Sequence, residues 1–145
     1  MRLDGPEATE ALGRRIGALL RHGDVVALYG DLGAGKTTLA RGILRGLGFE
    51  GEVASPTFPI VLPYEQLDVP LWHVDLYRIE DQAEVEELAL DEALQDGALV
   101  IEWPERLGGL LWPESLKLSL VRDGAEARAL TAQVPAAWGG RWPPR

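Results

Sequence analysis

The segment GDLGAGKTT (residues 30–38) constrains the fold more than any other part of this sequence. It matches the pattern G-x-x-x-x-G-K-[ST] at every fixed position. A wholly apolar run, VVALY (25–29), precedes it, and LARGILRGLG (39–48) follows. A short, continuously apolar run is typical of a strand buried on both faces of a parallel sheet. The sequence therefore predicts a strand, a tight loop and a helix that begins inside the loop, as in an α/β fold.

The residues of this loop indicate phosphate binding. Glycines let successive backbone N–H groups turn inward and cradle the α- and β-phosphates of a nucleotide, and the helix dipole adds positive potential. Lys36 would reach the β- and γ-phosphates, and the Thr37 hydroxyl would ligate Mg²⁺. An ordinary glycine-rich turn would need neither residue, and Lys36 is one of only two lysines in the chain. The predicted nucleotide-binding residues of the loop are Asp31, Leu32, Gly33, Ala34, Gly35, Lys36, Thr37 and Thr38.

The remaining hydrophobic pattern predicts a helix before the loop and further strands and a helix after it. Apolar residues at three- and four-residue steps predict an amphipathic helix over 7–21. Asp81 followed by Glu84 resembles a capping box and predicts an acidic helix to about Leu94. Strands are expected at 71–75 and 98–103, with the proline-flanked 60–64 as an edge strand, and a hairpin turning at Asp123-Gly124 within 116–134. We expect one domain over 1–135 and a Trp/Pro-rich tail over 136–145.

Two carboxylates stand at the ends of predicted strands. Asp75 ends the apolar run 71–74, and Glu102 closes the run 98–101. Ligands of open α/β sheets bind at the carboxyl ends of the strands, so both side chains should converge on the glycine-rich loop. There they could ligate Mg²⁺ or orient an attacking water. Two structural alternatives stay open: Asp75 caps the following turn, and Glu102 forms a salt bridge with Arg106.

Other candidate residues lie near these carboxylates. Ser55-Pro56-Thr57-Phe58 lies where phosphate-loop switch proteins place a mobile loop that brings a hydroxyl to the γ-phosphate, although an ordinary turn would explain it equally well. His73 is interpreted as a packed structural histidine. Trp72 and Trp103 are interpreted as core or site walls, because basic residues do not alternate with them as in a base-stacking platform.

Composition excludes several classes of protein. The chain of 145 residues has a formal net charge of −9, which argues against a broad surface for DNA or RNA. It has no cysteine and only two histidines, which excludes a disulfide framework, a thiol nucleophile and a histidine-rich metal centre. No apolar run approaches the roughly 20 residues that cross a bilayer. We therefore expect a cytoplasmic protein without a membrane span.

Four segments together resemble one known family. They are GDLGAGKTT (30–38), SPTF (55–58) followed by Tyr64, HVDLYR (73–78) and IEWPER (101–106). The chain is similar to the bacterial TsaE (YjeE) family, the small ATPase of threonylcarbamoyladenosine tRNA modification, from about Thr9 to Arg128. The resemblance implies a three-layer, P-loop NTPase-like α/β sandwich with a central, mostly parallel sheet and a β-hairpin. It also implies that ATP hydrolysis, yielding ADP, serves the TsaB–TsaD complex, which acts on an adenosine next to the anticodon.

The resemblance assigns roles to individual residues. Lys36 and Thr37 match the nucleotide and Mg²⁺ contacts, Asp75 matches the second-motif aspartate, and Glu102 matches the metal-associated carboxylate. Ser55 and Thr57 match a first switch-like segment, and Trp103 follows the carboxylate in a second. The chain departs from the family at GAEAR (124–128), where the first arginine of a Gly-Arg-Glu-Ala-Arg stretch is missing. Arg128 is then the candidate substitute for a nucleotide contact.

Three other functions share the phosphate loop. A small-molecule kinase would need an acceptor subdomain and an arginine-bearing lid, for which 145 residues leave little space. A GTP switch would need an N-K-x-D motif, which a chain without asparagine cannot supply. A nucleotide-binding scaffold without turnover would be distinguished from an ATPase by phosphate release, which Glu102→Ala would leave unchanged.

The acidity is concentrated between residues 80 and 92. These side chains form a solvated helix face, or they steer the protein toward a basic patch on a partner, where they would compete with tRNA. They are Glu80, Asp81, Glu84, Glu86, Glu87, Asp91 and Glu92. The net charge of −9 indicates that this chain meets tRNA only indirectly.

Overall fold

The computed structural model describes residues 1–53 and 60–145, which form one seven-stranded mixed sheet. Its strand order is β1-β7-β6-β2-β5-β4-β3. The four central strands, β6, β2, β5 and β4, are parallel to one another, whereas β1, β3 and β7 pair antiparallel to their neighbours. The strands are β1 (Arg2–Leu3), β2 (Val25–Tyr29), β3 (Val61–Tyr64), β4 (Leu71–Asp75), β5 (Ala98–Glu102), β6 (Leu116–Arg122) and β7 (Arg128–Gln133).

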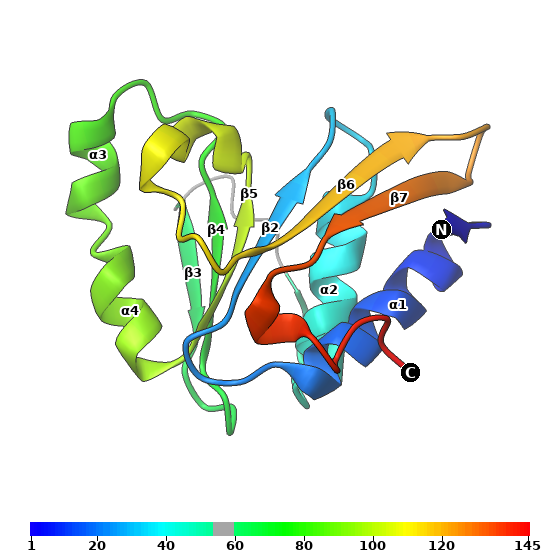
Figure 1. Ribbon diagram of the computed structural model, residues 1–145, viewed down its shortest axis with the longest axis horizontal. Coiled ribbons are helices and arrows are strands. Elements are labelled where there is room, and N and C mark those ends of the chain that lie inside the picture. The colour runs from blue at the N-terminus through cyan, green and yellow to red at the C-terminus, as the bar shows by residue number, and fades with distance from the viewer. Residues whose placement is uncertain (54–59) are drawn as a thin grey trace.

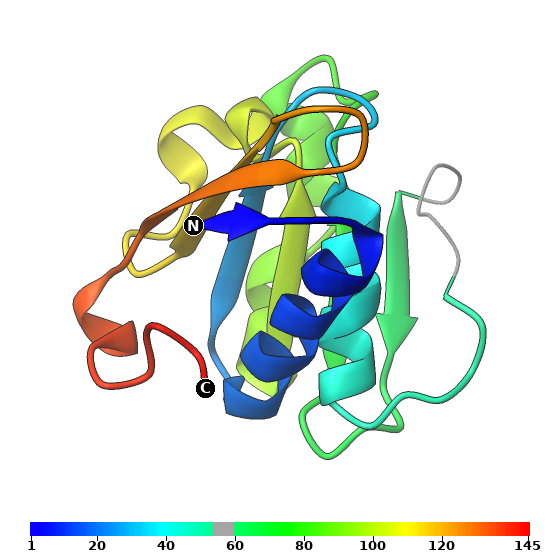
Figure 2. The same cartoon turned by 90° about the vertical axis from the view of Figure 1, so that its right-hand side faces the viewer.

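Helices cover both faces of the sheet (Figure 1). One face carries α1 (Pro6–Leu19) and α2 (Lys36–Gly46). The other carries α3 (Gln82–Glu87), α4 (Leu90–Asp96) and the 3₁₀ helix η1 (Pro104–Leu110). Figure 2 shows α1 running beside α2, with β1 leading into α1. A second 3₁₀ turn, η2 (Ala136–Trp138), follows β7.

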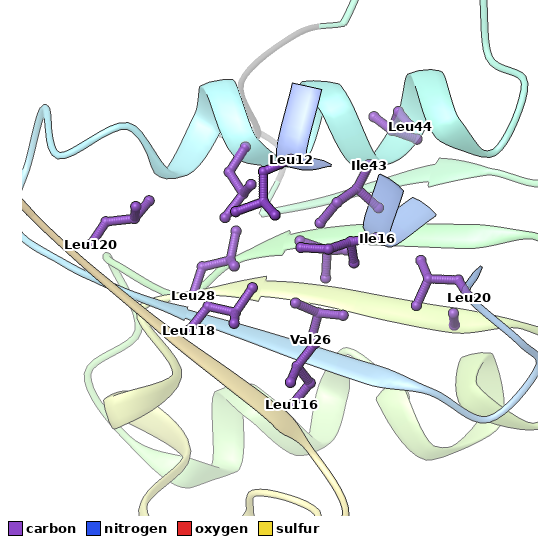
Figure 3. Close-up of a cluster of buried hydrophobic side chains, with 14 of the residues drawn as sticks. Leu12, Ile16, Leu20, Val26, Leu28, Ile43, Leu44, Leu116, Leu118 and Leu120 are labelled. Carbon is purple, nitrogen blue, oxygen red and sulfur yellow. The ribbon is translucent and has the colours of Figure 1, made fainter. Parts of the chain in front are cut away.

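The alternation of side chains along the strands explains why both faces need helices. Val26 and Leu28 of β2 point into the cluster formed with α1 and α2, together with Leu116 and Leu118 of β6 (Figure 3). Val25 points the opposite way, into a second cluster that includes residues of β5, α3 and α4. A strand that is apolar at every position is buried on both sides. The expected α/β fold with mostly parallel central strands and a hairpin is confirmed.

The α1 and α2 helices touch backbone to backbone. Glycines on both helices face each other, and a Cβ atom at Gly17 would lie 2.1 Å from the Ile43 carbonyl oxygen. A Cβ atom at Gly42 would lie 2.2 Å from the Glu10 carbonyl oxygen. Only glycine fits at such distances, so the pair is locked in one register. Because α2 begins at Lys36, this contact fixes where the glycine-rich loop ends.

The prediction of one acidic helix over residues 81–94 is wrong in one respect, because the structure has two short helices there, α3 and α4. Asp81 does cap the first, accepting hydrogen bonds from the Ala83 and Glu84 backbone N–H groups. The break falls at Ala89, which has a left-handed φ of 53° that no regular helix contains. No glycine or proline marks the position, so the sequence pattern carries no sign of it.

The last residues of the chain pack onto the α1 side of the molecule. Trp138 is fully buried in the cluster that contains α1 and α2. Arg141 forms two hydrogen bonds with the Asp24 carboxylate, at 2.6 and 3.1 Å, and donates a third to the Leu19 carbonyl oxygen. The boundary at residue 135 stays a prediction. Among the described residues, no helix is both long and apolar enough to cross a membrane.

Candidate functional site

The glycine-rich loop forms a tight turn between β2 and α2. Gly30, Gly33 and Gly35 all have positive φ, at 150°, 78° and 106°. At Gly30 a second constraint applies, because a Cβ atom would lie 2.7 Å from the Leu120 carbonyl oxygen of β6. The loop can take this path only with glycine at these positions. Its backbone therefore curls as a phosphate-binding loop requires.

Lys36 lies inside this curl and is only 5 % exposed. Its Nζ donates a hydrogen bond of 2.6 Å to the Gly30 carbonyl oxygen. The ammonium also lies over the Trp103 ring, 3.8 Å from its centroid. Burial lowers the pKa of Lys36 from its usual range, and the carboxylates of Glu102 and Glu105 oppose that shift. The lysine is thus held at the loop.

The pairing of β4 with β5 brings the two candidate carboxylates together. Asp75 and Glu102 are register partners on these parallel strands. Val100 points toward α1 and α2, and side chains two residues apart on a strand share a face. Glu102 therefore also faces α2, and its Oε1 lies 3.5 Å from the Thr37 hydroxyl oxygen, which donates to it. The structure brings Thr37, Asp75 and Glu102 to one edge of the sheet.

Asp75 has a local structural role besides its place in the site. Its Oδ1 accepts a 2.9 Å hydrogen bond from the Tyr77 backbone N–H, so it caps the turn after β4, as one alternative expected. Partial burial raises the pKa of the Asp75 carboxyl above its ordinary value of 3.8, and the Glu102 charge raises it further. The Tyr77 hydrogen bond and the nearby Lys36 ammonium oppose this rise in pKa.

Glu102 makes its shortest side-chain contact with His73. The distance from Glu102 Oε2 to His73 Nε2 is 2.7 Å, and the two side chains are 5 % and 0 % exposed. The alternative salt bridge of Glu102 with Arg106 is not among the ion pairs of the described residues. The interpretation of His73 as a merely packed residue missed this contact. The sequence pattern places His73 on the same face of its strand as Asp75, but it does not place His73 beside Glu102.

Trp103 closes one side of the site. It has a left-handed φ of 59°, a conformation that costs free energy in a non-glycine residue and often marks a functional position. Its ring lies 4.9 Å from the Tyr77 ring, centroid to centroid, in addition to its contact with Lys36. Trp72 packs instead against the α3–α4 side of the sheet.

Arg128, at the start of β7, stabilises the glycine-rich loop by donating hydrogen bonds to it. Its Nε donates to the Ala34 carbonyl oxygen at 2.8 Å, and a terminal nitrogen donates to the Gly33 carbonyl oxygen at 3.2 Å. A guanidinium that bonds these carbonyls favours the curled loop with its N–H groups free to face a ligand. A direct contact of Arg128 with nucleotide stays a prediction.

These parts surround one cavity of about 420 Å³. Of the predicted site residues, its lining contains Leu32, Gly33, Gly35, Lys36, Thr37, Thr38, Asp75, Glu102, Trp103 and Arg128. Asp31 and Ala34 do not line it, and Ser55 and Thr57 lie outside the described residues. Ile60, Tyr77 and Arg78 also line the cavity, and sequence reasoning missed them. Tyr77 and Arg78 belong to the HVDLYR segment, so that motif could have pointed to them.

The oxygen donors at this edge fit Mg²⁺. This cation prefers hard oxygen ligands and usually takes one or two carboxylates, with water and substrate phosphates completing its octahedron. Thr37 and the two carboxylates offer that donor set. The described residues hold no cluster of three or more His, Asp or Glu side chains suited to a metal ion. Such a closed, all-protein site is not what Mg²⁺ with a nucleotide requires.

Fold and site define a mixed α/β protein with a complete phosphate-loop motif between a buried parallel strand and a helix. The chain belongs to the TsaE family: residues 3–130 match the family described as "Threonylcarbamoyl adenosine biosynthesis protein TsaE".

Curated relatives and a solved structure agree with this assignment. The chain is 41 % identical over 127 residues to the "tRNA threonylcarbamoyladenosine biosynthesis protein TsaE" of Bacillus subtilis, covering 87 % of this chain and 79 % of that protein. It is 44 % identical over 135 residues to the protein of the same name in Streptomyces coelicolor, covering 90 % and 91 %. The crystal structure of Bacillus subtilis YdiB superposes with a TM-score of 0.80 at 33 % identity, over 94 % of this chain and 85 % of that one.

Proposed function

We propose that this protein binds ATP with Mg²⁺ and hydrolyses it to ADP and phosphate, as a P-loop ATPase with the three-layer sandwich of that class. One observation supports this above all. Lys36, Thr37 and Glu102 line a single cavity at the carboxyl edge of parallel strands, beside a loop whose glycines adopt positive φ. This is the arrangement in which a phosphate chain is gripped next to a carboxylate.

Nucleotide binding would replace the Gly30 hydrogen bond of Lys36 with contacts to phosphate. The phosphate chain would follow the loop N–H groups and the start of α2. Lys36 would leave the Gly30 carbonyl oxygen for the β- and γ-phosphates, which restores a full partner to a partly desolvated ammonium. Trp103 would then lie beside the bound phosphates, since its ring contacts Lys36.

Thr37, Asp75 and Glu102 would hold Mg²⁺, directly or through water. When bound, the ion neutralises charge on the β- and γ-phosphates. Glu102 would orient the attacking water toward the γ-phosphorus. As the new P–O bond forms, the bond from the γ-phosphorus to the bridging oxygen breaks, and ADP leaves with the bonding electron pair. One proton of the attacking water passes to another oxygen of the phosphate product. The proposed hydrolysis has no acceptor other than water.

We further propose that hydrolysis serves tRNA threonylcarbamoyladenosine synthesis, as the names of the relatives indicate for those proteins. In this role the protein is a switch or reset factor for the TsaB–TsaD complex in the cytoplasm, and it meets tRNA only through that complex. The net charge of −9 supports the indirect contact with tRNA. DNA and membranes have no part in the proposal.

Phosphate release tests the partner role. The rate is measured for the protein alone, with the TsaB–TsaD complex, and with Lys36→Ala as the control for contaminating ATPase. We expect slow turnover alone and a clear rise with the complex, both lost in Lys36→Ala. Equal rates with and without the complex would contradict the switch role, and transfer of phosphate to a metabolite at a higher rate would favour a kinase.

A further inference from the structure

The His73–Glu102 pair is the least expected contact in the core. His73 lies in the middle of β4, where its register partners are Leu62 of β3 and Val100 of β5. The side chain is fully buried, yet its only polar contact among the described residues is the 2.7 Å bond to Glu102. A buried imidazole surrounded by apolar strands costs free energy unless it is hydrogen-bonded.

The second ring nitrogen identifies the donor. His73 Nδ1 is buried and lacks a hydrogen-bond partner in the described part of the chain. A proton on Nδ1 would leave a buried N–H unsatisfied and turn the Nε2 lone pair against the Glu102 carboxylate. The neutral tautomer with its proton on Nε2 avoids both costs. His73 therefore donates to Glu102 Oε2.

This donation fixes the direction in which the other Glu102 oxygen, Oε1, points. Oε2 is engaged by His73, while Oε1 lies 3.5 Å from the Thr37 hydroxyl oxygen, at the loop. Without the imidazole, a Glu side chain could rotate about its terminal torsion, which is broad. Residues that hydrogen-bond a ligating carboxylate or imidazole fix its orientation in many metal sites.

We propose that His73 is a positioning residue: it holds Glu102 so that Oε1 faces Thr37 and the proposed ATP site. His73 does not touch nucleotide, because β4 buries it beneath Glu102. The proposal concerns how the site proposed above is oriented and rests on that function only for its kinetic test.

The kinetic test uses two substitutions of His73. His73→Leu keeps an apolar volume but removes the donor, and His73→Gln keeps an N–H near the position of Nε2. We expect His73→Leu to lower kcat about 10- to 100-fold with KM for ATP changed less than about threefold, and His73→Gln to recover most of kcat. Equal losses in both variants, or a loss confined to KM, would contradict the proposal.

Combination with Glu102→Gln separates positioning from packing. If His73 acts through Glu102, His73→Leu should lower kcat little further in the Glu102→Gln background. Independent, multiplying losses in the double variant would show that His73 acts otherwise. Thermal unfolding of each variant, monitored by circular dichroism, identifies any loss that is due to unfolding.

A readout without ATP tests the contact itself. Long-range ¹H–¹⁵N NMR of the imidazole in the nucleotide-free protein distinguishes the two neutral tautomers. We expect the Nε2–H form in the wild type and a shifted Nε2 signal in Glu102→Gln. An Nδ1–H tautomer, or signals that ignore the Glu102 substitution, would overturn the proposal even if the protein hydrolyses ATP. Absent hydrolysis with the expected NMR signals would instead overturn the proposed function.

Discussion

The two helical layers of this protein differ in how they meet the sheet. On one face, α1 and α2 span 14 and 11 residues and approach so closely that their glycines face opposing backbone carbonyls. On the other face, α3 and α4 span only 6 and 7 residues and are separated by the left-handed Ala89. In the first layer these contacts fix the position of α2, whose first residue is Lys36 of the glycine-rich loop.

The layers also differ in charge and in their link to the site. The short-helix layer carries the acidic residues between 80 and 92, and residues 79–105 contain no lysine or arginine. Its third member, η1, begins directly after Trp103, whose ring covers Lys36. The two layers therefore have different roles: one holds the glycine-rich loop in place, and the other connects the site to the protein surface.

The glycine contact of α1 and α2 should be the most sensitive position. Gly17→Ala places a methyl group 2.1 Å from the Ile43 carbonyl oxygen, so the helices must separate. We expect a loss of about 1–3 kcal/mol in the free energy of unfolding, measured by urea denaturation.

Gly109→Ala is the matched control in the other layer. Gly109 is exposed, and no atom lies within 4 Å of where its Cβ would be. The change should stay within about 0.5 kcal/mol. Comparable losses of unfolding free energy at Gly17 and Gly109 would show that the close contact of α1 and α2 is not a special site of stability.

Charge reversal in the short-helix layer should weaken association with the TsaB–TsaD complex. Glu86→Lys with Glu92→Lys alters two exposed residues of α3 and α4, and we expect roughly 3- to 10-fold weaker binding at low salt. The difference should shrink as salt is added, because exposed charges are screened. Binding is measured by surface plasmon resonance at several salt concentrations.

The control reverses two exposed charges after α2, Glu50→Lys with Glu52→Lys, at the same net charge. Its binding should stay close to that of the wild type. If both pairs weaken binding equally, the acidic residues of α3 and α4 form only a solvated face.

Asp75 should show a small effect of pH on stability. Its pKa is raised in the folded protein, so ionisation costs folding free energy as pH rises above the ordinary value of 3.8. Asp75→Asn, which can still accept the Tyr77 hydrogen bond, should stabilise the protein near neutral pH by well under about 1 kcal/mol, because solvent screens a half-buried carboxylate.

Unfolding free energies of wild type and Asp75→Asn across pH check this sign. The advantage of the variant should vanish below the ordinary carboxyl range, where both side chains are neutral. A variant that is less stable at neutral pH and equally stable in acid would mean that the native site favours the Asp75 carboxylate.

Most of the fold could be predicted from sequence because its strands and long helices have strong periodicity. The apolar run of β2, the Lys36 loop and the Asp123-Gly124 hairpin are local signals. The break at Ala89 could not be predicted, since tertiary packing imposes a left-handed residue where local sequence favours helix. The His73–Glu102 bond depends on the register of β4 against β5, and no pattern within one strand specifies the register of its neighbour.

The most direct test of ATP hydrolysis at this site compares wild type with Glu102→Gln in two measurements on the same protein: equilibrium binding of ATP with Mg²⁺, and phosphate release. The amide keeps the shape of the side chain but loses its charge, so we expect binding within a few-fold of wild type and hydrolysis reduced at least about 100-fold. Normal phosphate release by Glu102→Gln would contradict the proposed role of the Glu102 carboxylate in ATP hydrolysis.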